Sequence, residues 1–308
     1  MAMSAAVPTS MRDRFARSYT GAFSRRWVVP VFMVVWIGLV IVPLAILVAY
    51  SFFESRSFAT VYVPTLKTWD IIFSSGRFEV ALRTLRIGLT VTVVELLIGF
   101  PFAVWLAKGC KSKRVQAAAI SLLTIPFFLD ISSRTIVWRA ILGQNGLINS
   151  MLLDLGIIRQ PMEWMLYTEF SVHFGMIAPY FPTMVLPIFL AVSFIENDLI
   201  EASSDLGASP FQNFRNIILP LSLPGVMAGV IFTLGPALAA WVEPGMLGGG
   251  FVNLLSNSVE SAYTALKYPT LAALSTLVVL ILAVLLAVMV LLTRRVADLG
   301  GAFRAMRR

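Results

Sequence analysis

The stretch DLIEASSDLGASPFQNFRNIILP, residues 198–220, decides how the rest of the chain is interpreted. It places charged and helix-ending residues between two long apolar blocks. Asp198 followed three residues later by Glu201 is typical of a capping box, which opens a helix. Gly207 stands where a left-handed residue would end that helix. The pattern therefore predicts a short helix over about residues 199–206.

A second helix is predicted directly after the glycine. Ser209 offers an N-cap oxygen, Pro210 suits the first turn, and Gln212 is the third-position partner of a second capping box. The apolar face of this helix would consist of Phe211, Phe214, Ile217 and Ile218. We therefore expect helix, glycine turn, helix, with the second helix covering about residues 211–218. The alternative is a solvated connection in which Glu201 does no more than cap its own helix.

The rest of the chain has the composition of a membrane protein. Of its 308 residues, 58% are hydrophobic and 13% are charged, whereas an average soluble domain is about 25% charged. A helix needs roughly 20 apolar residues to cross the hydrocarbon core of a bilayer. The blocks that meet this length lie at about residues 28–50, 84–107, 117–141, 171–194, 221–242 and 269–293. We therefore expect an all-α integral membrane protein with six transmembrane helices and both ends on one side.

The basic residues predict which side that is. With the N-terminus inside, the inner segments hold a basic tail over residues 1–27, the cluster at 108–114, Arg215 and a second basic tail over residues 294–308. The outer segments hold Arg56, Lys67, Arg77, Arg159 and Lys267. Because cytoplasmic segments carry the excess of Lys and Arg, we expect an N-in/C-in topology for the six-span domain of residues 28–293. The net charge of +8 then reflects topology, and no nucleic-acid partner is expected.

Proline and glycine inside the apolar blocks predict how the spans pack. Proline occurs there as Pro43, Pro101, Pro126, Pro179, Pro182, Pro187 and Pro236. Each proline frees backbone groups that neighbouring helices or water in a cavity must satisfy. Gly225 and Gly229, spaced as G-x-x-x-G, predict a close approach between two helices.

The sequence contains no evident catalytic set. No G-x-x-x-x-G-K-[ST] phosphate loop is present, so this chain does not bind ATP by that device. Cys110 is the only cysteine and His173 the only histidine, and neither has the neighbours of a metal site. We expect an inert thiol at Cys110, a packing role for His173, and a subunit that is not an enzyme and binds no cofactor.

The order of residues in the opening stretch resembles a known motif. Glu201-Ala202-Ser203, three residues, Gly207, nine residues, and then Ile217-Ile218-Leu219-Pro220 is similar to the EAA loop of ATP-binding-cassette (ABC) importer permeases. The family pattern has alanine where this chain has Ser203. The resemblance implies a type I ABC importer permease-like fold, with residues 196–220 forming a cytoplasmic coupling helix between spans 4 and 5. The residues it assigns to ATPase coupling are Glu201, Ala202, Ser203, Asp205, Gly207, Ala208, Ser209 and Pro210.

Further segments resemble one branch of that family, the spermidine/putrescine permeases. They are ILGQNGLINSMLLDLGI from Ile141, PYFPTMVLPIFLAV from Pro179, EASSDLGASPFQNF from Glu201 and EPGMLGGG from Glu243. The resemblance implies import of polyamines or related small organic solutes by alternating access. An opine, an amino-acid derivative or a phosphonate remains an alternative solute.

The same resemblance implies a set of partners. It implies a cytoplasmic ABC ATPase dimer that holds ATP and Mg, and a second permease subunit in the bacterial inner membrane. It also implies a periplasmic or lipid-anchored solute-binding protein, with membrane lipid surrounding the spans.

The candidate translocation path consists of Glu95, Asp130, Trp138, Tyr180, Trp241 and Glu243. A charge at the bilayer centre costs at least about 2.5–3.5 kcal/mol, so ionisable residues within a span invite a functional explanation. Aromatic faces and carboxylates suit an organic cation. Alternatives remain open. Asp130 and Arg134 are four residues apart and could neutralise each other. Glu95 could pair with another helix or carry a proton, and the tryptophans could be interfacial anchors.

A rival function is a secondary transporter driven by protons through Glu95 or Asp130. It requires no ATPase subunit, and it leaves the helix pair of residues 198–220 unexplained. A membrane-embedded scaffold or enzyme is a second rival. The enzyme would need a catalytic constellation that the sequence does not show.

Overall fold

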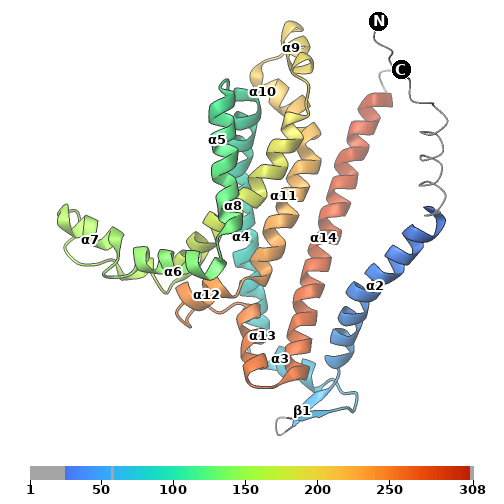
Figure 1. The fold of residues 1–308 in the computed structure, drawn as a ribbon, viewed down its shortest axis with the longest axis vertical. Helices are drawn as coiled ribbons and strands as arrows, with labels where there is room; N and C mark the ends of the chain where they lie inside the picture. Colours follow the sequence, from blue (N-terminus) through green and yellow to red (C-terminus); the bar gives the residue numbers. More distant parts are fainter. Residues whose placement is uncertain (1–24, 57–58, 306–308) are drawn as a thin grey trace, which may run out of the picture. The chain divides into compact units, whose positions relative to one another are not determined.

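The computed structural model describes residues 25–56 and 59–305 (Figure 1). Within these residues, five helices are long and apolar enough to cross a membrane, or six if a bent pair is counted as one span. The chain divides into two units, residues 1–50 and residues 51–308. The all-α class predicted from the apolar blocks is confirmed.

The first unit contains helix α2 (Arg25–Tyr50). Its segment Val29–Tyr50 has a mean hydropathy of 3.0 and is long enough to span a bilayer. Pro30 and Pro43 lie inside this helix. The first predicted span is therefore a helix, whereas most of the predicted N-terminal tail, residues 1–24, lies outside the described residues.

Three helices pack together at the centre of the second unit. They are α4 (Arg77–Val104), α8 (Glu169–Ser193) and α11 (Leu219–Ala239), and each contacts the other two (Figure 1). Fully buried residues such as Val91, Met176 and Met184 fill the space between them. A π-helical turn, η1 (Trp105–Gly109), continues α4. This bundle is the scaffold that holds the candidate site.

Small residues bring α8 and α11 close together. A Cβ atom on Gly225 would lie 2.6 Å from the backbone oxygen of Pro187, and one on Gly229 would lie 2.8 Å from that of Met184. Carbon atoms do not approach oxygen so closely without displacing the backbone. The close approach predicted from the G-x-x-x-G spacing is therefore confirmed.

The third predicted span, residues 117–141, is not one straight helix. Its parts are α5 (Lys113–Thr124), the 3-10 turn η2 (Ile125–Phe128) and α6 (Ile131–Leu142), and α7 (Leu147–Asp154) follows. The chain bends by 102° between η2 and α6. Pro126 lacks a backbone N–H, and Asp130 starts a new helix by accepting a hydrogen bond from the Ser133 N–H at 3.1 Å. As a result, α6 and α7 extend sideways from the bundle (Figure 1).

Helices at the two ends of the bundle connect the long ones. One end carries α9 (Asn197–Asp205), α10 (Pro210–Asn213) and the π-helical turn η4 (Phe214–Ile218) (Figure 1). The opposite end carries α3 (Lys67–Ser74), the 3-10 turn η3 (Glu163–Met165), α12 (Val242–Leu247) and α13 (Leu255–Thr264). Strands β1 (Glu54–Arg56) and β2 (Ala59–Val61) also lie there as an antiparallel pair, with Glu54 opposite Val61. The apolar blocks did not predict this pair.

The last helix, α14, covers Tyr268–Ala305. It packs against α11, α13 and α3, and its buried residues Ala273 and Leu274 join Leu255 of α13 in one cluster. The predicted C-terminal tail, residues 294–308, therefore begins as a continuation of this helix.

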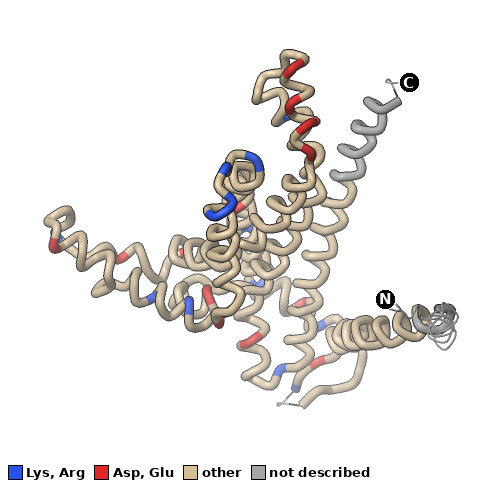
Figure 2. The backbone as a smooth tube through the Cα atoms, turned by 45° about the horizontal axis from the view of Figure 1, so that its top comes forward, with Lys and Arg blue, Asp and Glu red and all other residues tan. Residues whose placement is uncertain are grey.

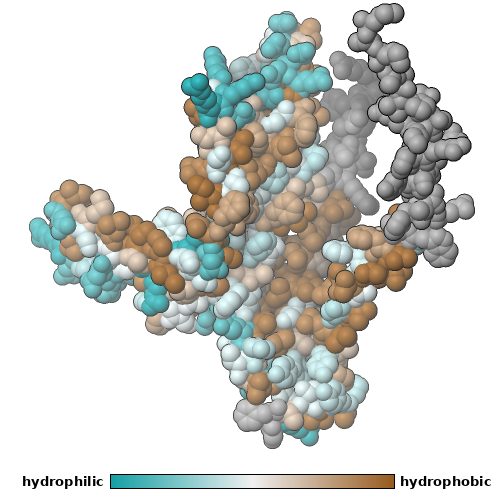
Figure 3. All heavy atoms as spheres, viewed as in Figure 1, coloured by the Kyte–Doolittle hydropathy of each residue, from teal (hydrophilic) through white to brown (hydrophobic). Residues whose placement is uncertain are grey.

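Large apolar side chains cover the lateral surface of the bundle (Figure 3). Leu97 is 69% exposed, Phe232 56% and Val284 61%. A soluble monomer rarely exposes contiguous apolar surface of this extent, whereas lipid tails cover it without cost. The second unit therefore has the surface of a membrane-embedded protein.

Candidate functional site

Helix α9 begins two residues earlier than the sequence predicted. Its N-cap is Glu196, which has an extended backbone, and no side-chain cap hydrogen bond is formed there. The predicted capping box of Asp198 and Glu201 is therefore wrong. Asp198 lies instead in the first turn, where its negative charge interacts favourably with the helix dipole.

A lysine that the sequence analysis missed holds the start of α9. The Lys108 ammonium, at the end of α4 in η1, donates hydrogen bonds to the Ile195 carbonyl and, at 2.8 Å, to Oδ1 of Asn197. These partners are 87 and 89 residues away in the sequence, so no local pattern indicated the contact. Lys108 thus connects the helix α4 directly to the beginning of α9.

The end of α9 has the glycine turn that was predicted. The Gly207 N–H donates to the Ser204 carbonyl at 2.9 Å, and the Ala208 N–H donates to the Ser203 carbonyl at 3.1 Å. This is the Schellman arrangement, and it requires the left-handed backbone that Gly207 adopts, with φ of +88°. The glycine therefore fixes where α9 ends and in which direction the chain leaves it.

The second capping box is also confirmed. The Ser209 N–H donates to Oε1 of Gln212 at 2.7 Å, and the Gln212 N–H donates to Oγ of Ser209 at 3.3 Å. The separate helix predicted over residues 211–218 is wrong, because α10 passes without a break through η4 into the span α11. Pro220 has no N–H, and the wider π turn keeps the backbone bonded ahead of it, with the Leu219 N–H donating to the Phe214 carbonyl.

One face of α9 is attached to this continuous helix, and the other face is exposed. The Asn213 amide donates to Oγ of Ser204 at 2.8 Å, and Ile200 packs beside Phe214 against the buried cluster around Val192. On the other face, Glu201 and Asp205 are exposed, and acidic residues follow one another along α9 (Figure 2). A displacement of α9 would therefore act on α11 through these contacts.

The predicted coupling residues surround this exposed face and the glycine turn. Glu201, Ala202, Asp205 and Gly207 are exposed, as are Ser209 and Pro210, while Ser203 and Ala208 are half-buried. Leu206, which was not among the predicted residues, is 89% exposed at the tip. An exposed apolar side chain next to the Asp205 carboxylate gives this tip the character of a docking surface.

A buried polar cluster lies inside the bundle. Glu95 of α4 is completely buried, and among the described residues neither carboxylate oxygen has a hydrogen-bond partner. Thr233 of α11 lies beside it, but the Thr233 hydroxyl pairs with that of Thr183 at 3.1 Å. An unpaired buried carboxyl group is costly, so its presence indicates a role other than packing.

Tyr180 and Glu243 meet in the same region. The Tyr180 hydroxyl donates to Oε1 of Glu243 at 3.1 Å, and both side chains are buried. Glu243 belongs to α12, beyond the end of the spanning helix, and burial raises the pKa of its carboxyl while the hydrogen bond from Tyr180 acts in the opposite direction. Arg134 of α6 is close enough to affect both groups, and its Nε atom is buried without a partner within the described chain.

The other predicted path residues have different surroundings. Trp138 packs edge-on against Phe174, with 4.8 Å between ring centroids, and touches the buried cluster that contains Tyr180. Trp241 is 51% exposed. Asp130 is exposed and caps α6, and the described residues show no ion pair between it and Arg134. The structure thus places Glu95, Tyr180 and Glu243 in the interior and Asp130 and Trp241 at the surface.

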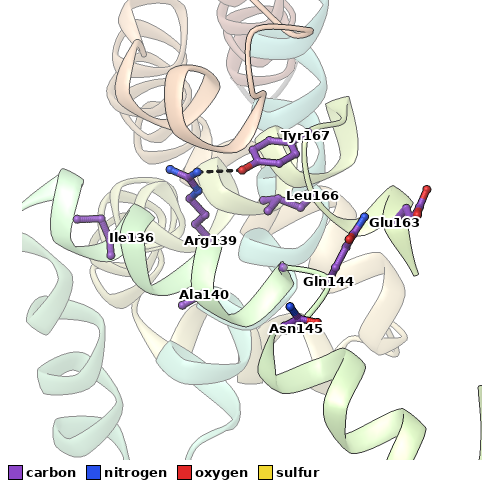
Figure 4. Close-up of a pocket in the computed structure, with 9 residues that line it drawn as sticks. Ile136, Arg139, Ala140, Gln144, Asn145, Glu163, Leu166 and Tyr167 are labelled. Atoms are coloured by element: carbon purple, nitrogen blue, oxygen red, sulfur yellow. Dashed lines mark hydrogen bonds between the residues drawn. The ribbon is translucent and has the colours of Figure 1, made fainter. Parts of the chain in front are cut away.

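A separate open cavity of about 500 Å³ lies beside α6 (Figure 4). Nη2 of Arg139 donates to the Tyr167 hydroxyl at 2.9 Å, and the guanidinium lies 5.7 Å from the centre of the same ring. Tyr167 has a φ of +62°, and its N–H donates to the Leu247 carbonyl at 2.9 Å. A Cβ on Gly249 would lie 2.3 Å from the Tyr167 ring, so this glycine allows the contact. No local signal in the sequence indicated this pocket.

His173 and Cys110, for which the sequence predicted no catalytic or metal-binding role, make only local contacts with the backbone. Nδ1 of His173 lies 2.6 Å from the Glu169 carbonyl one turn earlier, and Cys110 contacts the Ser112 carbonyl at 3.4 Å. Across residues 25–56 and 59–305, no group of three or more His, Cys, Asp or Glu side chains could hold a metal ion.

Comparison with known proteins gives consistent matches. Residues 80–298 match the family described as binding-protein-dependent transport system inner membrane component. The chain is similar to the spermidine/putrescine transport system permease protein PotB of Haemophilus influenzae, with 32% identity over 225 residues that cover 73% of this chain and 78% of that protein. PotB of Escherichia coli K12 is 31% identical over 257 residues, covering 82% of this chain and 92% of that protein.

A solved structure has a similar fold. It is a bacterial ABC transporter involved in the import of the acidic polysaccharide alginate, and its matching chain aligns with a TM-score of 0.65. The match covers 93% of this chain and 99% of that chain, at 16% sequence identity. At this identity the match shows the fold alone, which is the type I importer permease-like fold that the sequence predicted.

Proposed function

The chain belongs to the family of binding-protein-dependent transport system inner membrane components, and from this premise we propose that it conducts spermidine, putrescine or a related small organic cation. Members of this family are non-catalytic permease subunits of ABC importers. The PotB relatives, named for spermidine and putrescine, support the solute class. The location that follows is the bacterial inner membrane.

The observation that carries the proposal is the exposed acidic helix α9 joined to the span α11. Glu201 and Asp205 face outward, and Ser204 and Ile200 attach a different face of the helix to α10 and η4. A cytoplasmic ATPase that binds α9 would therefore move α11 when it closes. Through this contact, ATP binding and hydrolysis on the partner would drive the permease between outward-open and inward-open states.

The buried polar cluster supplies the chemistry for a cationic solute. Glu95 and Glu243 are buried carboxylates, and the Tyr180 ring lies next to one of them. Ammonium groups bind carboxylates through charge-assisted hydrogen bonds and lie favourably over aromatic faces. Because these groups are buried here, they would meet the solute only when the helices part during the transport cycle.

Further subunits complete the proposed importer. A path built from the spans of one chain would be narrow, so a second permease subunit is expected beside this one. A solute-binding protein would deliver the solute to the end of the bundle opposite α9, and an ABC ATPase dimer carrying ATP and Mg would bind the α9 end. The proton-driven alternative is not favoured, because it gives α9 no role.

The test measures solute-stimulated ATP hydrolysis and uptake of labelled putrescine and spermidine by the assembled transporter in lipid nanodiscs and vesicles. Glu201→Lys reverses one charge on the exposed face of α9, and Asp154→Lys is the matched control, since Asp154 is an exposed carboxylate at the end of α7. The proposal predicts that Glu201→Lys uncouples hydrolysis from transport and that the control does not. Normal uptake by Glu201→Lys would contradict the coupling role, and stimulation only by other solutes would contradict the solute class.

A further inference from the structure

A polar pocket of about 260 Å³ is lined by the first turn of α4 and by helix α13. Helix α13 lies at the end of the bundle opposite α9 (Figure 1). Its lining includes two cationic side chains, Arg77 of α4 and Lys267, which follows α13. The polar residues Ser258, Ser261, Asn253 and Asn257 also line it. No carboxylate belongs to the lining, so the pocket has a net positive charge.

Neither cation of this pocket has an ion-pair partner within the described chain. Nη1 of Arg77 is buried and has no hydrogen-bond partner among the described residues. A buried guanidinium nitrogen without an acceptor is costly, and an anion in the pocket would remove that cost.

The backbone of α13 does not use these cations as a cap. At its end, the Ala262 carbonyl accepts from the Lys267 N–H and the Tyr263 carbonyl from the Leu266 N–H, both at 2.9 Å. The Ser261 carbonyl accepts from the Ala265 N–H at 3.1 Å. Since the last carbonyls of the helix already have partners, Arg77 and Lys267 remain available for a ligand.

Two backbone features shape the site. Helix α4 has 28 residues and starts at Gly76 without a side-chain cap, so its first turn presents the positive end of the helix dipole. Leu266 has a φ of +55°, a conformation that is strained for a bulky residue. This strained residue directs the chain so that Lys267 lines the pocket.

Exposed apolar and aromatic residues neighbour the lining residues Arg77 and Lys267 in the sequence. Phe78, next to Arg77, is 44% exposed and lies 5.8 Å from Phe73 between ring centroids. Leu266 and Tyr268, which flank Lys267, are 48% and 43% exposed. Exposed aromatic residues beside basic groups at the end of a spanning helix are typical of the level of lipid headgroups.

We propose that this pocket, formed by Arg77, Lys267 and Ser258, binds the phosphate group of an anionic ligand. A phospholipid headgroup and a free phosphate ester share this chemistry. The phosphate accepts hydrogen bonds from the guanidinium, the ammonium and the serine hydroxyl, and the exposed side chains of Phe78, Leu266 and Tyr268 contact the remainder of a lipid. A polyamine is repelled here, so the pocket is distinct from the proposed path for a cationic solute.

The test measures binding of a fluorescent short-chain phosphatidylglycerol to the full chain, purified and delipidated in detergent. Arg77→Gln and Lys267→Gln each remove one cation, and each is expected to weaken binding about tenfold or more. Lys267→Arg keeps the charge and is expected to retain binding. Arg159→Gln is the matched control, because Arg159 is exposed and lies outside the pocket.

Competition separates the two sources of phosphate. Displacement of the labelled lipid by glycerol phosphate and inorganic phosphate would assign the site to a soluble ester, and failure to displace it would assign the site to lipid.

Because Lys267 is exposed, Lys267→Gln is expected to fold even if Arg77→Gln does not. Wild-type lipid binding by Lys267→Gln would overturn the proposal. If that variant instead lost affinity for a solute-binding protein, the pocket would belong to a carboxylate on that partner.

Discussion

Replacement of Gly207 by alanine is expected to loosen α9 without disturbing the rest of the bundle. The residue has a φ of +88°, and a Cβ there would have no atom within 4 Å, so the cost is backbone strain alone. For an L-residue that strain is about 1–2 kcal/mol, which corresponds to a roughly 5- to 30-fold change in an opening equilibrium. Since Gly207 ends α9, we expect the cost to fall on local opening of this helix.

Gly156 provides a matched control for this substitution. It ends α7 with the same pair of hydrogen bonds, from the Gly156 N–H to the Leu153 carbonyl and from the Ile157 N–H to the Leu152 carbonyl. Its φ is +67°, and a Cβ there would also be in open space. Gly156→Ala therefore imposes a similar strain at a position away from α9.

The assay combines hydrogen exchange of the α9 amides with solute-stimulated ATP hydrolysis by the assembled transporter. Gly207→Ala should speed exchange in α9 by roughly 5- to 30-fold and reduce the stimulation, because a larger fraction of α9 is open. Gly156→Ala should change exchange only near α7 and leave the stimulation intact. Unchanged α9 exchange in Gly207→Ala, or an equal loss of stimulation in both variants, would refute the reasoning.

Further variants test the packing, the anchoring of α9 and the buried cluster. Gly225→Ala should lower thermal stability by about 1–3 kcal/mol because its Cβ meets the backbone of α8, whereas Gly235→Ala in the same helix, with open space around it, should be neutral or slightly stabilising in the same thermal unfolding assay. Lys108→Met should weaken ATPase binding in a pull-down assay, because it removes both hydrogen bonds to the start of α9, and wild-type binding would argue against this anchoring role. Tyr180→Phe should raise the Michaelis constant for putrescine uptake, since it removes the hydroxyl that orients Glu243, and Tyr263→Phe, at an exposed position, should not; equal constants in the two variants would exclude the cluster from the path.

Much of the fold follows from local and compositional signals. The apolar blocks predicted α2, α4, α8, α11 and α14, because burial in lipid requires long apolar segments whatever the tertiary structure. The ends of short helices were predictable where local turn or cap chemistry decides them. Gly207 ends α9, and the capping box of Ser209 and Gln212 starts α10, and both depend only on neighbours in the chain.

The failures arose where hydropathy and capping rules allow more than one outcome. The block 117–141 is apolar throughout, and hydropathy does not register that Pro126 and the cap at Asp130 turn the chain. The start of α9 was misplaced because both Glu196 and Asp198 suit the beginning of a helix. Continuation of η4 into α11 was missed, because Pro220 more often ends a helix than follows a π turn.

Within the candidate site, residue types were predictable, but their contacts were not. Glu95 and Glu243 drew attention because carboxylates are rare near a span, yet the hydrogen bond between Tyr180 and Glu243 joins residues 63 positions apart. In the sequence, Lys108 served only as one of the basic residues that predict the membrane topology. Its contacts with α9 depend on the folded chain. Arg77 and Lys267 likewise meet only through tertiary packing.

The central claim is that α9 is the surface on which an ABC ATPase docks, and site-specific cross-linking tests it most directly. Cys110 is the only native cysteine, so a Cys110→Ser background allows a single new thiol at Glu201 or, as the control, at Asp154. The account predicts that Glu201→Cys cross-links to the ATPase subunit in membranes and that the cross-link yield changes when ATP binds. A cross-link from Asp154→Cys, with none from Glu201→Cys, would contradict the account.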